Sequence, residues 1–256
     1  MSRRRPPRPW EGPVTPVDPA DLLGPRGLTE DVLRGDERDG EAAHAPARFY
    51  WSLLTAERKA RIESVVEARL QSVTVVLDRL LDPHNTAAVL RTAEGLGLAR
   101  VHLVAHQAAD GLAHRRVTQD AHKWLDVETH ASGALAARRL RESGFAVWAG
   151  HLDRAARLYS ELPADRPMAL VFGNEHEGPS PETLAACTGT FRIPMAGFTQ
   201  SFNVSVAAGI ALARLATARR RLLGRPGDLP EEARVQLRDR FTLLAAKFAR
   251  RMKPRP

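Results

Sequence analysis

The sequence predicts an α/β protein in which a mostly parallel sheet is covered by helices on both faces. Apolar runs alternate with helical segments between residues 73 and 215, a pattern typical of parallel strands joined by helices. The first run, VTVVLDRL, is predicted to be a buried strand. With 256 residues and 43% hydrophobic content, the chain can form a substantial core.

Five strands and three intervening helices are expected in the central part of the chain. Gly144 closes the second helix, and Ser180 is the expected N-cap of the third. Gly95 and Gly97 lie at the end of the first helix, so we interpret them as C-cap glycines and not as a dinucleotide-binding fingerprint. The predicted strands cover residues 73–80, 99–105, 145–152, 166–173 and 189–194, and the predicted helices cover 86–96, 132–144 and 180–187.

The stretch IPMAGFTQSFNVSVAAGIALARL joins the last strand to a long helix. Ser201 or Asn203 is expected to cap this helix, because either side chain can accept a hydrogen bond from the first turn. Small and apolar residues then recur at helical spacing on one face, which lets another backbone approach closely. These residues are Val204, Ala207, Ala208, Ala211 and Leu215.

We predict three parts in the chain. A flexible basic and Pro-rich extension covers residues 1–46, a globular domain covers 47–225, and a basic helical extension covers 226–256. Thr55 is expected to cap the first helix of the globular domain, TAERKARIESVVEARLQ. Four basic residues are predicted on the exposed face of that helix: Arg58, Lys59, Arg61 and Arg69.

Positive charge is concentrated at both ends of the chain, whose formal net charge is +8. Residues 1–10 hold four arginines and no acid. Residues 214–255 hold thirteen Lys and Arg against four Asp and Glu, a balance of +9, which leaves −5 for the body between the two ends. Basic segments commonly neutralise phosphates. The C-terminal one is predicted to be helical over residues 231–251, which favours nucleic acid over simple solvation there.

The composition also indicates where in the cell the protein is expected. Cys187 is the only cysteine, so neither an internal disulfide nor a cysteine-rich metal site is expected. No apolar run reaches the roughly 18 residues of a membrane span. The N-terminal MSRRRPPRPWEGP has no apolar core after its arginines, so we expect no secretory signal. We therefore predict a cytoplasmic protein that does not enter a membrane.

Several familiar site chemistries are absent from the sequence. It contains no GxxxxGK[ST] phosphate-binding loop and no GxSxG nucleophile elbow. His102 and His106 are four residues apart, a spacing that in a strand separates the side chains by roughly 13 Å, too far to share a metal ion. We therefore predict no metal site.

Three polar clusters each follow a predicted strand, at residues 85–91, 173–178 and 195–203. In open α/β sheets, ligands bind at the carboxyl ends of the strands. Arg91 stands out because it lies in an otherwise apolar helical segment, AAVLRTAEGLG. By itself it could be an ion-paired structural residue or a group directed into a site. Glu175 could equally be a solvated loop acid.

Taken together, DPHNTAAVLRTAEGLG, LVFGNEHEGPS and IPMAGFTQSFNVSVAAGIALARL resemble, in order and spacing, the three motifs of the SPOUT superfamily of methyltransferases. More narrowly, the chain resembles the TrmH family of tRNA ribose 2′-O-methyltransferases, which act on the guanosine at position 18 of the D-loop. The resemblance covers about residues 57–225, including AHKW at 121–124, and leaves the first 50 residues outside.

The resemblance implies a trefoil-knotted α/β fold, in which the last strand and helix thread through an earlier loop, and a homodimer formed through the knot region. The knot loops would hold S-adenosylmethionine. Gly150 stands where threonine is frequent in the family and Phe202 where leucine is usual, so a side-chain contact at residue 150 would be lost. By position, the cofactor contacts fall on Gly150, Gly173, Ile193, Met195 and Phe202.

The implied reaction transfers a methyl group from a sulfonium to a ribose hydroxyl and needs neither a metal nor a covalent intermediate. The resemblance assigns activation of the 2′-hydroxyl to Arg91, with Asn85 positioning it. Glu175, Ser201 and Asn203 would shape the site. An arginine is a poor base, because a guanidinium pKa above about 12 leaves almost no neutral form. Electrostatic stabilisation of the developing alkoxide is therefore an open alternative.

Five basic residues are predicted to contact RNA, because they lie in AHKW or in the basic helical segments. The domain shows no separate module for gripping ribosomal RNA, so we expect tRNA, with the target nucleotide taken out of its stack. Ribosomal RNA is the alternative substrate, and a non-catalytic RNA-binding protein of this fold is the alternative of another class. The predicted RNA contacts are Lys123, Arg58, Arg61, Arg219 and Arg221.

Overall fold

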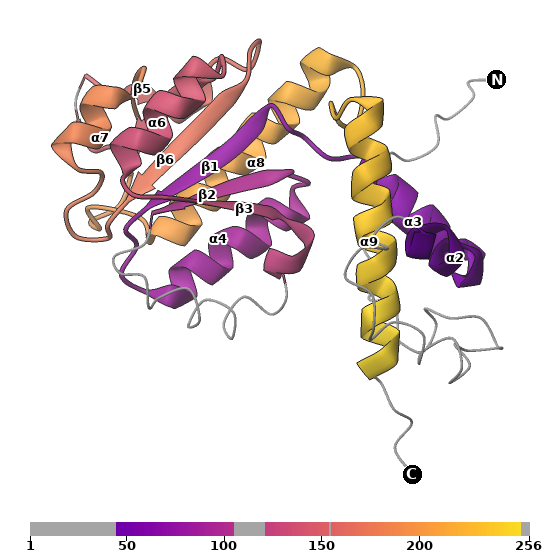
Figure 1. Cartoon of the computed structure of the whole chain (residues 1–256). Coiled ribbons are helices and arrows are strands. Elements are labelled where there is room, and N and C mark those ends of the chain that lie inside the picture. The colour runs from indigo at the N-terminus through magenta and orange to yellow at the C-terminus, as the bar shows by residue number, and fades with distance from the viewer. Residues whose placement is uncertain (1–44, 105–120, 154, 252–256) are drawn as a thin grey trace. The chain divides into compact units, whose positions relative to one another are not determined.

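The computed structural model describes residues 45–104, 121–153 and 155–251, so the predicted extension over 1–46 lies almost entirely outside the described residues. The described residues fall into two compact units (Figure 1). One holds the sheet and runs from Arg69 to Asp228. The other holds the helices that precede and follow it in the sequence.

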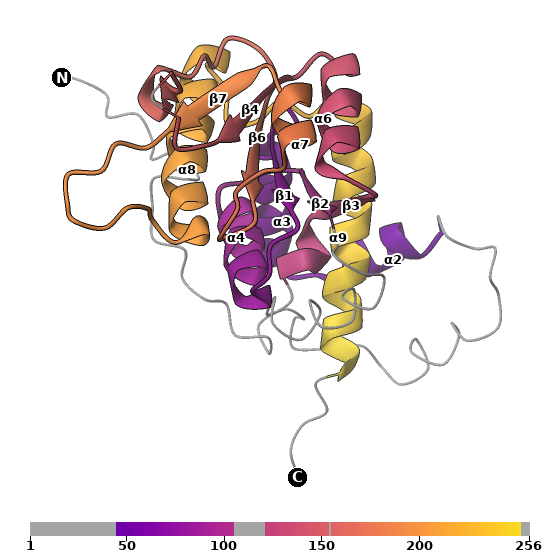
Figure 2. The same ribbon diagram turned by 90° about the vertical axis from the view of Figure 1, so that its left-hand side faces the viewer.

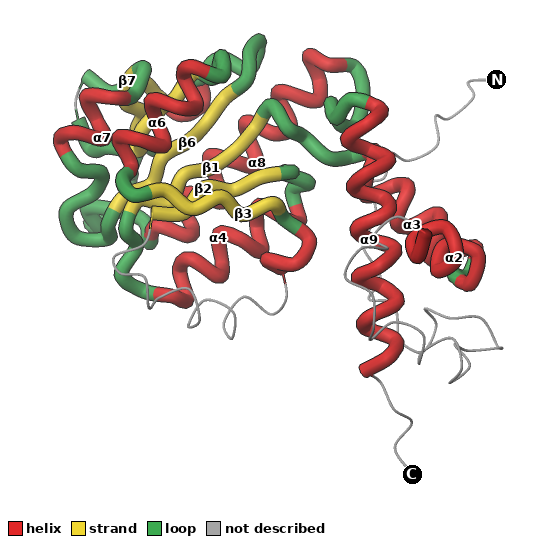
Figure 3. The backbone as a smooth tube through the Cα atoms, in the orientation of Figure 1, coloured by secondary structure: helices red, strands yellow, loops and turns green. Residues whose placement is uncertain are grey.

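A seven-stranded sheet forms the centre of the larger unit (Figure 3). Its order is β3-β2-β1-β6-β4-β7-β5, and every pairing between named strands is parallel. This confirms the α/β prediction, and all five predicted strands form. The strands are β1 (Val73–Asp78), β2 (Arg100–Val104), β3 (Asp126–His130), β4 (Ala146–Gly150), β5 (Arg157–Leu158), β6 (Met168–Gly173) and β7 (Gly189–Arg192).

The two strands that the sequence did not predict both lie at the edges of the sheet. β3 reads DVETH, and its acids pair with a basic residue of the neighbouring strand: Asp126 Oδ2 lies 2.7 Å from the Arg100 guanidinium. β5 has only two residues. Edge strands need little apolar sequence because one side stays open to solvent, so neither shows the apolar run that predicts a buried strand.

Helices cover both faces of the sheet (Figures 1 and 2). Successive residues of a strand point to opposite faces. Val75 of β1 therefore packs in the apolar cluster under α4 and α8, while Val76 packs in the cluster under α6. α4 (Pro83–Gly95) and α8 (Val204–Leu223) lie on one side, and α6 (Gly133–Glu142) and α7 (Pro181–Ala186) lie on the other.

Capping side chains set where the helices begin. Asp82 caps α4 and is followed by a proline, so this helix starts at Pro83 and not at residue 86 as predicted. Ser180 caps α7, which confirms the prediction. Of the two candidates for α8, Asn203 is the cap, and its Oδ1 accepts a hydrogen bond from the backbone N–H of Ser205 at 2.9 Å.

The small residues of α8 pack as predicted. Ala208 and Ala211 are buried, and the helix lies against α4, β1 and β6. Side chains of this size allow the axis of α8 to approach the sheet and α4 closely. The trefoil knot implied by the resemblance stays a prediction.

Three helices form the part of the smaller unit that the structure describes. Thr55 caps α3 as predicted, accepting a hydrogen bond from the backbone N–H of Arg58 at 3.1 Å. Phe241 and Ala245 of α9 are buried, and α9 packs along α2 and α3. The C-terminal helix predicted over residues 231–251 is therefore confirmed. The helices are α2 (Ala45–Leu53), α3 (Ala56–Glu67) and α9 (Glu231–Arg251). None of the helices in the described part of the chain is both long enough and apolar enough to cross a lipid bilayer.

The prediction that Arg69 lies on an exposed basic face is wrong. α3 ends at Glu67, and Arg69 is only 1% exposed. Its Nη2 lies 3.0 Å from Glu94 Oε1, and its Nη1 donates to the backbone carbonyl of Leu98 at 2.9 Å. A buried guanidinium requires such partners, since removing it from water is otherwise costly.

Asp228 closes the larger unit three residues beyond the predicted boundary at residue 225. Its carboxylate accepts hydrogen bonds from the backbone N–H of Gln71 at 2.6 Å and from the Ser72 hydroxyl. The segment after α8 is therefore tied to the start of β1, and the sheet unit extends to Asp228.

Candidate functional site

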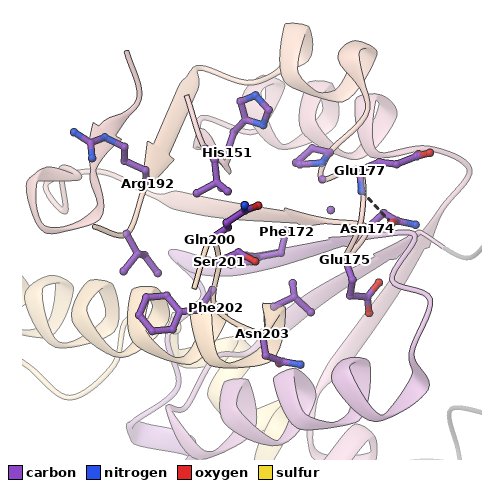
Figure 4. A pocket seen from close by; sticks show the side chains of 18 of the residues that line it. His151, Phe172, Asn174, Glu175, Glu177, Arg192, Gln200, Ser201, Phe202 and Asn203 are labelled. Atoms are coloured by element: carbon purple, nitrogen blue, oxygen red, sulfur yellow. Dashed lines mark hydrogen bonds between the residues drawn. The ribbon is translucent and has the colours of Figure 1, made fainter. Parts of the chain in front are cut away.

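A cavity of about 500 Å³ opens at the carboxyl ends of β4, β6 and β7. Open α/β sheets bind ligands at this edge. The loop after β6 and the loop from β7 to α8 supply most of its walls, and Figure 4 shows side chains from both around one space. The rings of Phe172 and Phe191 line it in an edge-to-face contact with their centroids 5.8 Å apart.

The loop after β6 is held in a tight turn. The Asn174 carbonyl accepts a hydrogen bond from the Gly178 N–H at 2.8 Å, and its side-chain Oδ1 accepts one from the His176 N–H at 2.8 Å. A Cβ atom at Gly173 would lie 2.0 Å from the backbone nitrogen of Pro179. Only glycine allows the end of β6 to approach the turn this closely.

One hydrogen-bonded chain of side chains connects the three polar clusters of the sequence. The Asn85 side chain, in the first turn of α4, donates through Nδ2 to Glu175 Oε1 at 2.9 Å. Its Oδ1 accepts from Asn203 Nδ2 at 3.0 Å. Asn203 also caps α8. Asn85 is 8% exposed and uses both ends of its amide, so it fixes the two loops and α4 to one another.

Glu175 is held as a carboxylate by the turn that precedes α4. It accepts hydrogen bonds from the backbone N–H groups of Leu81 at 2.9 Å and Asp82 at 3.2 Å. Burial by itself opposes ionisation, but the hydrogen bonds from Asn85 and from these N–H groups outweigh it and lower the pKa of Glu175 below its usual value. A negative charge therefore lies beside the cavity at neutral pH.

All five residues predicted to contact the cofactor line this cavity. Two of them, Gly150 and Phe202, differ from the residues that are usual in the family. For Gly150, the structure shows whether a larger side chain would fit. A Cβ atom at Gly150 would lie 3.5 Å from the rings of Phe172 and Phe191, which is an ordinary contact. Glycine is therefore not demanded there by space. The five residues are Gly150, Gly173, Ile193, Met195 and Phe202.

The predicted catalytic residues divide into three groups. Glu175, Ser201 and Asn203 line the cavity (Figure 4). Asn85 reaches it through the hydrogen-bonded chain. Arg91 is exposed on α4 and is not among the described residues that line the cavity. Asn85 and Arg91 are six residues apart, and each residue of an α-helix turns the side-chain direction by about 100°. The two side chains therefore point in directions about 120° apart around the axis of α4.

The predicted RNA contacts differ in their exposure. Arg221 is exposed, whereas Lys123 lies half-buried in the short 3₁₀ helix Ala121–Trp124. Arg219 donates from Nε to the Ser72 hydroxyl at 2.9 Å and from Nη1 to the Ala164 carbonyl at 3.1 Å, so its guanidinium also has a structural role.

The other two predicted RNA contacts, Arg58 and Arg61, are half-buried on α3. Burial, and then the positive charge of Arg61, lower the pKa of Arg58. Arg58 Nε is buried without a hydrogen-bond partner among the described residues. Two cationic side chains close together repel each other, and a bound anion relieves this repulsion. The phosphate groups of RNA are anions of this kind.

The structure also brings into the cavity residues to which the sequence assigned no individual role, two of them within the polar clusters at 173–178 and 195–203. They come from the ends of predicted strands and the loops that follow. Their position directly after a strand is therefore the feature of the sequence that could have identified them as site residues. They include His151, Asn174, Arg192 and Gln200 (Figure 4). Cys187 lies elsewhere, and burial raises the pKa of its thiol to about 12, so it is a poor nucleophile.

Comparison with known proteins agrees with this geometry. The model of the SpoU rRNA Methylase family matches residues 72–213, from β1 into α8. The tRNA (guanosine(18)-2′-O)-methyltransferase of Thermus thermophilus is 38% identical over 158 residues, which cover 62% of this chain and 81% of that protein. The Escherichia coli protein of the same name is 34% identical over 158 residues, covering 60% and 67%.

Solved structures show the same similarity. The A. aeolicus TrmH/SpoU tRNA modifying enzyme superposes with a TM-score of 0.67 at 28% identity, covering 73% of this chain and 96% of that one. An AdoMet-bound rRNA methyltransferase from Sinorhizobium meliloti gives 0.50 at 28% identity, covering 59% and 56%. The fold, the strand-end cavity and these similarities define the class of protein, an RNA methyltransferase. More specifically, the chain belongs to the SpoU rRNA Methylase family.

The close approach at Gly173 gives a test of the cavity. We expect Gly173→Ala to weaken S-adenosylmethionine binding by about tenfold or more, because the new Cβ must displace the turn at Pro179. Isothermal titration calorimetry measures this affinity. Gly197→Ala is the matched control, since no atom lies within 4 Å of a Cβ there, and it should bind as the original chain does. Equal affinities for all three proteins would show that the turn does not shape the binding site.

Proposed function

We propose that this protein transfers a methyl group from S-adenosylmethionine to the ribose 2′-hydroxyl of guanosine 18 in the D-loop of tRNA. The observation that carries the proposal is the chain Glu175–Asn85–Asn203, which joins the three motif loops beside one cavity. The relatives that are 34% and 38% identical bear the name of this activity. A non-catalytic RNA-binding protein would have no need for these three residues to meet at a cavity.

The residues of the cavity fit S-adenosylmethionine. Apolar side chains, including Phe172 and Ile193, can pack on the adenine, and strand-end backbone groups can hydrogen-bond its polar edge. The carboxylates of Glu175 and Glu177 complement a positively charged sulfur. When bound, this cofactor supplies a methyl group that is already activated for transfer.

The protein must then orient the ribose hydroxyl and assist the loss of its proton. A guanidinium stays cationic near neutral pH, so we assign to Arg91 the stabilisation of the developing alkoxide and the binding of a phosphate beside it. Asn85 is a positioning residue, because its bonds to Glu175 and Asn203 hold the first turn of the helix that carries Arg91. Ser201 borders the cavity and can contact the incoming ribose.

The exposed position of Arg91 suits a large substrate. The methyl donor belongs in the cavity, whereas Arg91 lies on the outer surface of α4. A nucleotide turned out of its stack can reach both, with its ribose toward the cavity and its phosphate on the guanidinium. We propose Arg58, Arg61, Lys123, Arg219 and Arg221 as further phosphate contacts, with Arg219 the weakest candidate because of its internal hydrogen bonds.

Coverage favours tRNA over ribosomal RNA. This chain covers 96% of the A. aeolicus tRNA modifying enzyme, with the higher TM-score, but only 56% of the S. meliloti rRNA methyltransferase. The curated relatives named for guanosine 18 are covered to 81% and 67%. The similarity therefore extends over most of the tRNA enzymes and about half of the ribosomal one.

We further propose that the protein works as a homodimer in the cytoplasm, without a metal in the transfer step. Large apolar side chains are exposed around the loop from β7 to α8, which stands away from the sheet in Figure 2. Phe198 is fully exposed, and Val206 of α8 is 49% exposed. Such a patch is typical of a protein interface. A second copy meeting it here would enclose the cavity loops.

Arg91 is tested by substitution. Arg91→Ala should lower the single-turnover rate of tRNA methylation by about 100-fold or more, since a positioned cation is removed from the developing charge. Arg91→Lys should also fail, because an ammonium cannot reproduce the planar fork on a phosphate. Calorimetry should show S-adenosylmethionine affinity unchanged, because Arg91 does not line the cavity.

Arg138→Ala is the matched control for Arg91, since this exposed arginine lies on α6, across the sheet. It should retain the original rate. Substantial turnover by Arg91→Ala would remove Arg91 from the mechanism.

The substrate is tested with synthetic tRNA. We expect one methyl group on the ribose of guanosine 18, mapped by mass spectrometry of nuclease fragments. A tRNA with 2′-deoxyguanosine at that position keeps the base and lacks the acceptor, so it should bind and not react. Ribosomal RNA serves as the competing substrate. Methylation of ribosomal RNA with tRNA left unmodified would overturn the proposed substrate but not the family.

The dimer is tested by placing charge in the exposed apolar patch. We expect Val206→Asp to convert a dimer to a monomer in light scattering, because an interface would bury the carboxylate. Leu222→Asp is the control: this residue is 64% exposed near the other end of α8, and its substitution should leave the dimer intact. A monomeric original protein would contradict the proposal directly.

A further inference from the structure

Two buried histidines and a glutamate meet on strands β2 and β3, away from the cavity. His102 of β2 is paired in register with Glu128 of β3, and Val104 is paired with His130. His102, His130 and Glu128 therefore project from the same face of two neighbouring strands. Val104, next to His102 on that face, packs in the apolar cluster under α6. None of the three polar residues lines the cavity.

The cluster has the dimensions of a metal site. His102 Nδ1 and His130 Nε2 lie 2.9 Å apart. Glu128 Oε2 lies 3.7 Å from the first nitrogen, and Glu128 Oε1 lies 3.5 Å from the second. One ligand atom from each of the three residues can be chosen so that all three lie within 4.8 Å of one another. Ligand atoms about 2.0–2.1 Å from a tetrahedral zinc ion are about 3.3–3.4 Å from one another. The two nitrogens are closer together than this value and the carboxylate oxygens are farther from them, so side-chain shifts would bring the three ligands to the spacing of an ion site.

We propose that His102, Glu128 and His130 bind a divalent transition-metal ion of the zinc type and thereby tie the edge strand β3 to β2. Two imidazoles and one carboxylate are a ligand set that zinc accepts, with a fourth position left for water. Both imidazoles are almost fully buried, while the Glu128 side chain is 38% exposed. The ion therefore enters, and its water lies, on the Glu128 side.

An ion would change the tautomer of one histidine and replace the hydrogen bond between the two rings, while leaving the partners of the outer nitrogens as they are. With both rings neutral, one donates its inner N–H to the other, as the 2.9 Å separation requires. The outer atoms, His102 Nε2 and His130 Nδ1, are buried without a partner among the described residues. When an ion binds, the shared proton moves to the outer nitrogen of its own ring, and both inner lone pairs become ligands. The neutral pair binds the ion without releasing a proton.

A neighbouring arginine opposes the ion. Arg100 Nη1 lies 3.5 Å from Glu128 Oε2, and the same guanidinium lies 2.7 Å from Asp126. Because Arg100 and a metal cation compete for one carboxylate, removing the guanidinium should raise the metal affinity. This gives the cluster two variants with opposite expected effects.

Metal binding is measured on the full chain after treatment with a chelator and dialysis. Titration with Zn²⁺ in the calorimeter and with Co²⁺ by visible absorption should show one ion per chain, with the intense bands of tetrahedral Co²⁺. Glu128→Gln and His130→Asn should each weaken binding by about tenfold or more. Arg100→Gln should tighten it by up to about fivefold, the typical size of an exposed ion-pair effect. Zn²⁺ should raise the Tm of the original chain and not that of Glu128→Gln.

Glu142→Gln is the matched control, since this exposed carboxylate lies on α6 outside the cluster. It should bind metal as the original chain does. Glu128 is partly exposed, so its variant should fold even if the histidine variant does not, and circular dichroism checks this. The proposal is overturned if the chain binds no Zn²⁺, or if Glu128→Gln binds it with the original affinity. None of these measurements depends on methyl transfer, so the proposed function stands or falls separately.

Discussion

The two hydrogen bonds of the Asn85 side chain are the interaction on which the site depends. They join Glu175, at the end of β6, to Asn203, at the start of α8. Glu175 in turn binds the backbone N–H groups that precede α4. A buried amide with both ends satisfied stabilises one arrangement and penalises others, since any shift leaves a buried polar group unpaired. Three loops from distant parts of the chain thus have one relative position.

Close backbone packing gives the cavity its form around that network. Gly173 lets the end of β6 touch the turn at Pro179, and the small residues of α8 let the helix lie close to α4. At Gly173 the approach leaves no space for a larger side chain. The methyl donor is therefore expected to meet closely packed backbone, whereas Arg91 is exposed on α4 outside the lining of the cavity.

Some of the positively charged side chains in this protein are structural. Arg69 and Arg220 are buried, and Arg219 is half-buried with hydrogen bonds to Ser72 and Ala164. Arg220 donates to the carbonyls of Leu96 and Pro226. A guanidinium offers five donors and so can satisfy several carbonyls at once where chain segments converge. A basic composition by itself consequently overstates the surface available to phosphates.

The sequence by itself determined the α/β class, the five central strands, the caps at Thr55 and Ser180, and the strand-end position of the three motif clusters. These follow from local hydrophobic pattern and capping chemistry, which neighbouring residues decide. Tertiary structure decided the rest. Three features depend on partners that are distant in the sequence. They are the choice of Asn203 over Ser201 as the cap of α8, the hydrogen bond between Asn85 and Asn203 across 118 residues of chain, and the burial of Arg69. From the sequence, His102 could be compared only with His106, which lies outside the described residues. The register between β2 and β3 instead places His102 beside Glu128 and His130. Only the tertiary structure could decide this, because the pairing of two strands cannot be read from residue spacing along one of them.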